Sequence, residues 1–143
     1  MADTPKHSVS VAGIIVDDQD RVLAIRRRDN NHWEPPGGVL ELNETFEQGL
    51  RREILEETGV TITVDRLTGV YKNMTRGIVA LVFRCHTENR PRAVTAEAVE
   101  IRWMNGNEIA KTMDPAYAVR VLDAFERQPQ TRTHDGVDLT DAG

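Results

Sequence analysis

The residues most suited to chemistry are gathered in one short acidic segment of this sequence. Glu53, Glu56 and Glu57 stand close together, and Arg52 directly precedes the first of them. Carboxylate oxygens are the ligands that Mg²⁺ and Mn²⁺ prefer in proteins. A neighbouring arginine can orient a carboxylate through paired hydrogen bonds. The segment therefore indicates a site for a hard divalent cation.

The acidic segment is expected to lie on a helix that begins and ends at recognisable residues. Thr45 suits the N-cap, and Gln48 stands three residues later, where its side chain can complete a capping box. Gly59 follows the last turn and can adopt the left-handed conformation of a helix C-cap without steric cost. These signals predict a helix from about Phe46 to Thr58.

The predicted helix places two carboxylates on its apolar face. Each residue advances by about 100° around the axis, so Phe46, Leu50 and Ile54 form one apolar stripe. The same geometry places Glu53 and Glu57 within about 20° of Phe46. Like charges at this spacing repel, and negative charge opposes the dipole at a helix C-terminus. Burial of unpaired carboxylates adds a further cost, which a bound cation would remove.

A solvated acidic face explains the same helix without any metal. Arg51 and Arg52 could then pair with the glutamates in solvent. Gly49 favours the metal hypothesis slightly, because a glycine in mid-helix is unfavourable unless backbone or ligand approaches closely there. From the helix alone both interpretations stay open.

The remaining sequence predicts a mixed α/β (α+β) domain that spans residues 1–127. A β-hairpin is expected from the strands 9–16 and 21–28, and a final helix from Asp114-Pro115 to about Arg127. Residues 128–143 are polar and are expected to form a flexible tail. Further strands are predicted at 60–64, 67–72, 77–86 and 99–104, and a short helix at 105–111.

Composition excludes some classes of function. The net charge is −5 and the pI is near 5.4, which argues against nucleic-acid binding through a basic surface. The lone cysteine, Cys85, lies in an apolar run and is interpreted as a core thiol. The first residues lack the apolar stretch of a secretory signal, and no apolar run is long enough for a membrane span. A cytoplasmic location without a membrane partner is therefore expected.

The loop and helix together resemble the signature of the Nudix family, GX5EX7REUXEEXGU, in which U is an aliphatic residue. Every fixed position is matched, and the matching residues are Gly38, Glu44, Arg52, Glu53, Ile54, Glu56, Glu57, Gly59 and Val60. The resemblance implies the Nudix fold, a mixed β-sheet sandwiched between α-helices. It also implies an activity, in which water attacks a phosphorus of a nucleoside diphosphate linked to another moiety.

The resemblance assigns metal-binding roles to four residues. It implies that Glu53, Glu56 and Glu57 bind Mg²⁺, or Mn²⁺, directly or through water, with the Gly38 carbonyl as a further candidate ligand. The physical interpretation of the helix face and the resemblance agree on Glu53 and Glu57. The number of metal ions stays open.

The catalytic roles of other residues follow from the resemblance less directly. Arg52 is expected to orient the glutamates, with Glu44 as a further partner of its guanidinium. Two candidates for the general base stay open. One is Glu53, and the other is Glu97, which has the spacing of a metal-binding or water-activating glutamate in MutT-like members; Glu100 is a nearby alternative to Glu97.

The substrate is only broadly defined by the sequence. Strand alternation would place Arg26 and Arg28 on one face and Arg27 on the other, so Arg26 and Arg28 are candidates to bind a substrate phosphate. A merely charged strand end is an equal alternative. Motifs of several family branches are absent, which favours a nucleoside triphosphate or a broad range of nucleotides. The resemblance leaves a homodimer open, and a catalytically silent ligand sensor of the same fold is the alternative function.

Overall fold

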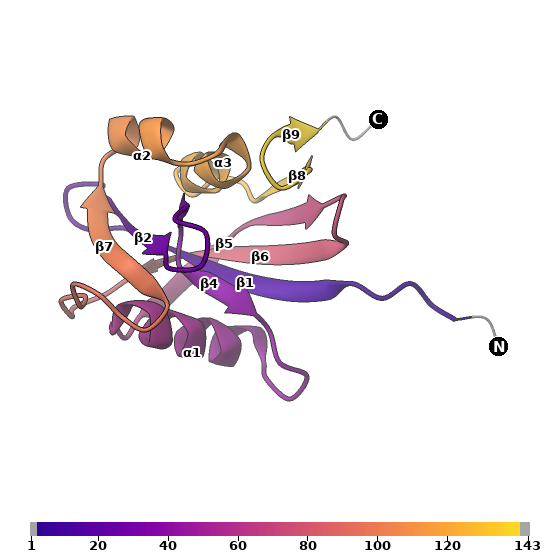
Figure 1. The fold of residues 1–143 in the computed structure, drawn as a ribbon, viewed down its shortest axis with the longest axis horizontal. Helices are drawn as coiled ribbons and strands as arrows, with labels where there is room; N and C mark the ends of the chain where they lie inside the picture. Colours follow the sequence, from indigo (N-terminus) through magenta and orange to yellow (C-terminus); the bar gives the residue numbers. More distant parts are fainter. Residues whose placement is uncertain (1–2, 141–143) are drawn as a thin grey trace.

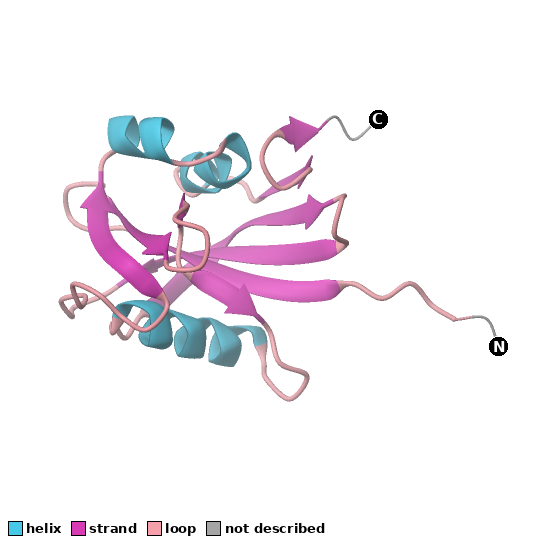
Figure 2. Cartoon of the chain, viewed as in Figure 1, coloured by secondary structure: helices cyan, strands magenta, loops and turns pink. Residues whose placement is uncertain are grey.

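The computed structural model describes residues 3–140, which form strands and three helices arranged in layers (Figures 1 and 2). The elements in chain order are β1 (Ser8–Ile15), β2 (Val22–Arg27), β3 (Trp33–Glu34), β4 (Gly37–Val39), α1 (Phe46–Thr58), β5 (Thr63–Asn73), β6 (Ile78–His86), β7 (Ala98–Met104), α2 (Gly106–Thr112), α3 (Pro115–Asp123), β8 (Gln130–His134) and β9 (Leu139–Thr140).

The larger sheet has six strands in the order β4-β1-β6-β5-β8-β9. It is mixed, because β1 runs parallel to β6 and β5 runs parallel to β8, whereas the other neighbours are antiparallel. Strand β1 lies inside the sheet and is buried on both faces, which explains its nearly continuous apolar sequence.

The smaller sheet has the order β3-β2-β7, and this arrangement corrects the predicted hairpin. Strands β1 and β2 belong to different sheets and share only an isolated bridge between Val16 and Val22. Because β1 has neighbours on both edges, β4 and β6, no edge is left for β2. The polar turn between them therefore carries the chain from one sheet to the other.

Helices cover both faces of the sheets, with α1 on one side and α2 and α3 on the other (Figure 1). Alternate residues of β1 supply the two cores: Val11 and Ile15 face α1, whereas Ala12 and Ile14 belong to the core beneath α2 and α3. The expected mixed α+β architecture, with sheet between helices, is confirmed. Among residues 3–140, no helix combines the length and apolarity that crossing a bilayer requires.

Helix α1 has the predicted limits and caps. Thr45 and Gln48 form the capping box, and Gly59 ends the helix with a φ of 80°. Leu50 and Ile54 are fully buried against the sheet, but Phe46, in the first turn, is half exposed. The apolar stripe is therefore shorter than predicted.

The helix lies very close to β1 at Gly13. A Cβ on Gly13 would lie 2.6 Å from the Cδ1 atom of Ile54, so a larger residue would force the end of the Ile54 side chain to shift. Glycine at this position therefore allows α1 to pack closely against β1.

The C-terminal segment differs from the expected tail. Gln130–His134 forms β8, which pairs with β5, and His134 is buried. Helix α3 also ends at Asp123, before the predicted Arg127, and Arg132 of β8 pairs with Asp123 at 2.7 Å. The prediction of a tail is thus wrong for Gln130–His134. Backbone pairing with β5 and an ion pair, rather than apolar residues, hold this strand in place, and neither leaves a hydrophobic pattern in the sequence. Residues 141–143 lie outside those described.

Candidate active site

Three carboxylates from two separate parts of the chain converge at the C-terminal half of α1. One oxygen each from Glu53, Glu57 and Glu97 lies within 4.8 Å of the others. Glu57 is buried, Glu53 is half-buried and Glu97 is exposed. The cluster is thus buried in the protein at Glu57 and accessible to solvent at Glu97.

Glu97 reaches α1 because its loop is attached to both neighbouring elements. The Thr95 hydroxyl donates to the Glu57 carbonyl at 2.9 Å, at the end of α1. The Arg28 guanidinium, just beyond β2, donates to the carbonyls of Thr95 and Ala96 at 2.9 and 3.1 Å. Pairing of β7 with β2 then fixes the residue that follows Glu97.

The cluster concentrates negative charge at Glu57. Burial, together with the charges of Glu53 and Glu97, raises the pKa of the Glu57 carboxyl to about 9. The Gly37 amide donates a hydrogen bond to this carboxyl at 3.2 Å. A carboxylate in this position needs a further positive partner.

Strand β4 lies directly against the cluster. A Cβ on Gly38 would lie 2.5 Å from both Cδ and Oε2 of Glu53, so any larger residue would displace this carboxylate. The close approach of backbone at Gly38 therefore belongs to the shape of the site.

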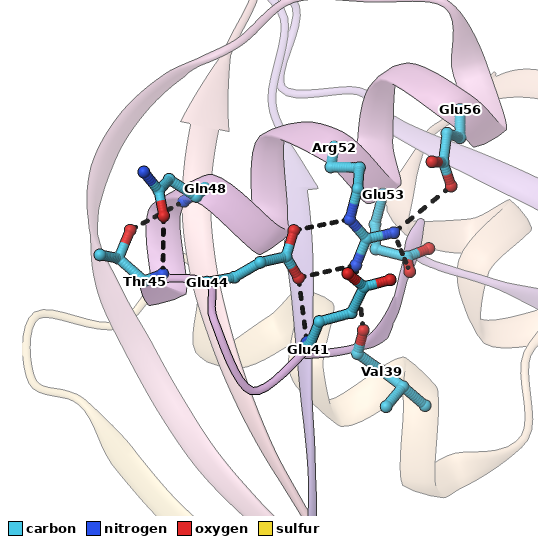
Figure 3. Close-up of polar contacts among 8 residues, drawn as sticks. All are labelled: Val39, Glu41, Glu44, Thr45, Gln48, Arg52, Glu53 and Glu56. Carbon is cyan, nitrogen blue, oxygen red and sulfur yellow. Dashed lines mark hydrogen bonds and ion pairs between the residues drawn. The ribbon is translucent and has the colours of Figure 1, made fainter.

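Arg52 lies between α1 and the segment that precedes it, where it contacts several acidic side chains, as Figure 3 shows. Its Nε and Nη2 donate to the two oxygens of Glu44 at 2.6 and 2.8 Å, and its Nη1 donates to Glu53 at 2.9 Å. A weaker contact of 3.5 Å joins Nη1 to Glu56, and Nη2 also donates to the Val39 carbonyl at 3.2 Å. One guanidinium thus connects the loop before the helix to Glu53.

The anchor of this arginine is itself fixed. Glu44 accepts from the Glu41 amide at 2.9 Å, and its hydrogen bonds with Arg52 lower the pKa of the Glu44 carboxyl to about 2. The same pairing raises the pKa of Arg52. Glu44 therefore stays charged, and Arg52 stays attached, at any physiological pH.

Two of the sequence-predicted carboxylates lie apart from the cluster. Glu56 is about half exposed and points to Arg52 (Figure 3), and it is not among the carboxylates that converge with Glu57. Glu100 lies on β7 and pairs with Arg26 at 3.4 Å. Of the two glutamates weighed near Trp103, the structure brings Glu97, not Glu100, to the helix.

The three consecutive arginines at the end of β2 and just beyond it do not alternate regularly, because the strand register shifts between Arg26 and Arg27. Arg26 donates to Asn31 at 2.9 Å. Arg27 pairs with Asp29 and Glu34 at 2.7 and 3.0 Å. The face shared by Arg26 and Arg28 is therefore not a simple consequence of strand geometry.

Two neighbouring cavities open beside the cluster. One of about 310 Å³ is lined by Glu57, Glu97, Arg27, Arg28, Asp29 and Ala96. The other, of about 490 Å³, extends from Gly37 and Gly38 to α3, and the two share Arg27 and Asp29. A long ligand could thus occupy both.

The second cavity contains residues that the sequence interpretation did not single out, chiefly Arg120 of α3. A signal was present: Arg120 stands four residues after Ala116 and so shares a face with it, and both are buried. An arginine on the buried face of a helix is uncommon without a partner.

The cluster fits a hard divalent cation. It offers oxygen atoms only, its innermost carboxylate is buried beside two others, and Gly38 leaves room where a side chain would fill the space. Glu53, Glu57 and Glu97 are the residues that would hold such an ion.

Comparison with known proteins agrees with the geometry. The family model described as NUDIX domain matches residues 6–125. A MutT-like protein of Streptomyces ambofaciens is 53% identical over 140 residues, covering 97% of this chain and 91% of that protein. A putative 8-oxo-dGTP diphosphatase of Bacillus subtilis is 28% identical over 103 residues, covering 71% of this chain and 69% of the other.

The fold agrees as well. The crystal structure of a NUDIX hydrolase from Nitrosomonas europaea superposes with a TM-score of 0.76 at 22% identity, covering 92% of this chain and 82% of that one. The signature residues, the family match and the fold lead to one conclusion: this chain belongs to the Nudix family and is a Nudix pyrophosphohydrolase.

Proposed function

We propose that this protein hydrolyses a nucleoside diphosphate linked to another moiety, with a nucleoside triphosphate as the favoured substrate, and that it requires Mg²⁺ or Mn²⁺. The observation that carries the proposal is the convergence of Glu53, Glu57 and Glu97 within 4.8 Å beside a cavity. Separate segments contribute these carboxylates, so a solvated helix face would not explain their convergence.

In this proposal, Glu53, Glu57 and Glu97 hold the metal ion, and the Gly38 carbonyl and Glu56 act as further ligands directly or through water. The bound ion supplies a Lewis acid that stabilises charge on the diphosphate oxygens. Arg52 keeps Glu53 in position because its guanidinium is fixed by Glu44.

The general base is assigned to Glu97 rather than Glu53. One oxygen of the Glu53 carboxylate already accepts from Arg52 at 2.9 Å, so that oxygen is engaged in positioning the helix side chains. Glu97 is exposed and lines the cavity, so with one oxygen committed to the metal ion the other is free to accept a proton from water, as that water attacks phosphorus and the phosphorus–oxygen bond to the leaving group breaks. Arg26 and Arg28 remain the proposed phosphate-binding residues, and Arg28 also lines this cavity.

The substrate proposal is supported by the relatives. The Streptomyces relative is called MutT-like and the Bacillus relative a putative 8-oxo-dGTP diphosphatase, so nucleoside triphosphates form the first substrate class to test. The acidic composition supports a small-molecule nucleotide rather than a nucleic acid as partner. A cytoplasmic location and a homodimer complete the proposal.

The test is a substrate screen with a matched pair of variants. The protein, Glu57→Gln and Glu47→Gln are incubated with nucleoside triphosphates, nucleotide sugars, ADP-ribose and dinucleoside polyphosphates in Mg²⁺, and products are separated by chromatography. Glu47 lies on the same helix, exposed and outside the cluster, so its substitution controls for a lost charge. We expect turnover of one class, lost in Glu57→Gln and kept in Glu47→Gln.

The alternative is a catalytically silent ligand sensor of the same fold. It predicts nucleotide binding without turnover by the unaltered protein, and affinity that Glu57→Gln leaves unchanged. That result would overturn the proposed hydrolysis.

A further inference from the structure

Arg120 is a buried arginine that forms no ion pair with the residues that the structure describes. It lies on α3 and is 7% exposed. Its Cζ atom lies 4.8 Å from the centre of the Tyr117 ring and 5.0 Å from that of Tyr71. Within residues 3–140 no aspartate or glutamate forms an ion pair with it. Aromatic rings partly compensate a cation but accept few hydrogen bonds from it.

The N–H donors of Arg120 are largely unused. Its Nε is buried and has no hydrogen-bond partner among the described residues. Its Nη2 lies 3.4 Å from Nε2 of His134, a weak contact, while Nδ1 of His134 accepts from the Gly136 amide at 3.0 Å. Buried donors without partners are costly, and a functional role is one reason for their retention.

The other charges of the second cavity do not supply a partner. Asp29 and Glu34 line it, but both are already paired with Arg27. The Tyr71 hydroxyl donates to the Asp123 carboxylate, which also accepts hydrogen bonds from the Arg132 guanidinium. Each of these acidic groups is thus paired with another side chain, and Glu34 acts on Arg120 as a nearby charge without forming an ion pair with it.

Arg120 faces the path that a substrate would take from the metal cluster. The second cavity, of about 490 Å³, includes Arg120 together with Gly37 and Gly38 of β4. Gly38 is in contact with Glu53, and Arg27 lines this cavity as well as the one beside Glu57. A diphosphate at the cluster would therefore extend its attached moiety toward Arg120.

We propose that Arg120 recognises the part of the substrate beyond the diphosphate, through a group that presents two adjacent hydrogen-bond acceptors in one plane. The proposal rests on the proposed hydrolase function. A guanidinium binds such a pair with two parallel hydrogen bonds. Two sources have this chemistry: the O6 and N7 edge of guanine, and a phosphate or carboxylate on the moiety.

The test compares four nucleotides that differ in this acceptor pair. They are dGTP, 7-deaza-dGTP, which lacks the N7 acceptor, dCTP, and deoxycytidine 5′-triphosphate carrying a 3′-phosphate. For each, kcat/KM is measured by chromatography, and binding by calorimetry with Ca²⁺ in place of Mg²⁺. The proteins are the unaltered chain, Arg120→Met, Arg120→Lys and Arg102→Met. Arg102 also lies over an aromatic ring, at 4.9 Å from Trp33, but lines neither cavity, so it is the control.

We expect the kcat/KM of the unaltered protein for dGTP, or for the 3′-phosphorylated nucleotide, to exceed its kcat/KM for dCTP by about tenfold to a hundredfold. If dGTP is preferred over dCTP but 7-deaza-dGTP is not, Arg120 recognises the O6 and N7 edge of guanine. If the 3′-phosphorylated nucleotide is preferred over dCTP, Arg120 recognises an anionic group instead. Arg120→Met and Arg120→Lys should abolish the preference, and Arg102→Met should keep it. The Tm of Arg120→Met should equal or exceed that of the unaltered protein, because an unpaired buried charge is removed.

Three results would overturn the inference: no preference in the unaltered protein, an equal loss for every nucleotide in the Arg120 variants, or failure of both variants to fold. Hydrolysis without dependence on Arg120 refutes this inference and leaves the proposed function intact. Conversely, binding that depends on Arg120, without hydrolysis of any nucleotide, refutes the proposed function alone. Absence of both binding and hydrolysis refutes both.

Discussion

The contact between Gly38 and Glu53 allows the geometry of the cluster to be perturbed without removing a charge. Alanine at position 38 adds a Cβ only 2.5 Å from the Glu53 carboxyl carbon. Carbon atoms in contact prefer a separation of about 3.5–4.0 Å, so the carboxylate must move by about 1 Å. Gly38 is not among the described residues with positive φ, so its backbone tolerates alanine.

A shift of this size has predictable consequences for Gly38→Ala. A displacement of about 1 Å in a catalytic group costs on the order of a hundredfold in rate. Disturbed support of a metal ligand weakens metal affinity by about 10–100-fold. We therefore expect Mn²⁺ affinity and kcat to fall by these factors, while the Tm stays within about 4 °C of the original.

The assays are Mn²⁺ titration followed by electron paramagnetic resonance, nucleotide hydrolysis and thermal denaturation. Gly106→Ala is the matched control, because its added Cβ would meet nothing within 4 Å. Unchanged Mn²⁺ affinity and rate in a folded Gly38→Ala protein would refute the role assigned to this contact. Equal losses in Gly106→Ala would do the same.

Three further predictions concern the surroundings of the site. Glu44→Gln removes the bidentate anchor of Arg52, so kcat/KM should fall by about 10–100-fold in steady-state assays, and unchanged kinetics would contradict this. Burial, and then the charge of Arg120, lowers the pKa of His134, so the unfolded chain protonates first and stability should decline below pH of about 6.5. The free energy of unfolding, measured with urea at several pH values, should fall less steeply with decreasing pH for His134→Gln than for the unaltered protein. Equal slopes for the two proteins would show that His134 is not the cause. Ending the chain after Gln128 removes β8 and should lower the Tm by at least about 5 °C, whereas an unchanged Tm would make the segment dispensable.

The catalytic helix was predictable because its determinants are local. A capping box at Thr45 and a C-cap glycine at Gly59 depend on residues that are near in sequence, and both form as predicted. Glu44 was expected as a further partner of Arg52 because it lies in the same loop-helix segment, but the two-bond pairing expected with one of the helix glutamates is made with Glu44 instead. Local capping and spacing therefore sufficed for α1.

Non-local pairing was harder to predict. The polar turn after β1 is compatible with a hairpin or with a change of sheet, and only the neighbours β4 and β6 decide between them. The polar strand β8 has no apolar alternation and depends on β5 and on the Asp123–Arg132 pair. In both cases the deciding contact is distant in sequence.

The site shows the same division. Glu53 and Glu57 share a helix face, which spacing alone reveals, but the approach of Glu97 depends on Thr95 and Arg28. The regular alternation assumed for the β2 arginines fails at a bulge that its sequence does not mark. The significance of Arg120 depends on ion pairs between other residues, Arg27 with Glu34 and Arg132 with Asp123, that its own sequence surroundings do not indicate.

The central claim is that the carboxylate cluster makes nucleotide hydrolysis depend on a divalent cation. The most direct test is the initial rate as a function of Mg²⁺ concentration for the unaltered protein and Glu57→Gln, on the substrate identified by the screen. Saturable activation by Mg²⁺ that is abolished in Glu57→Gln is the predicted result. Equal rates with and without Mg²⁺, or identical Mg²⁺ titrations for the two proteins, would contradict the claim.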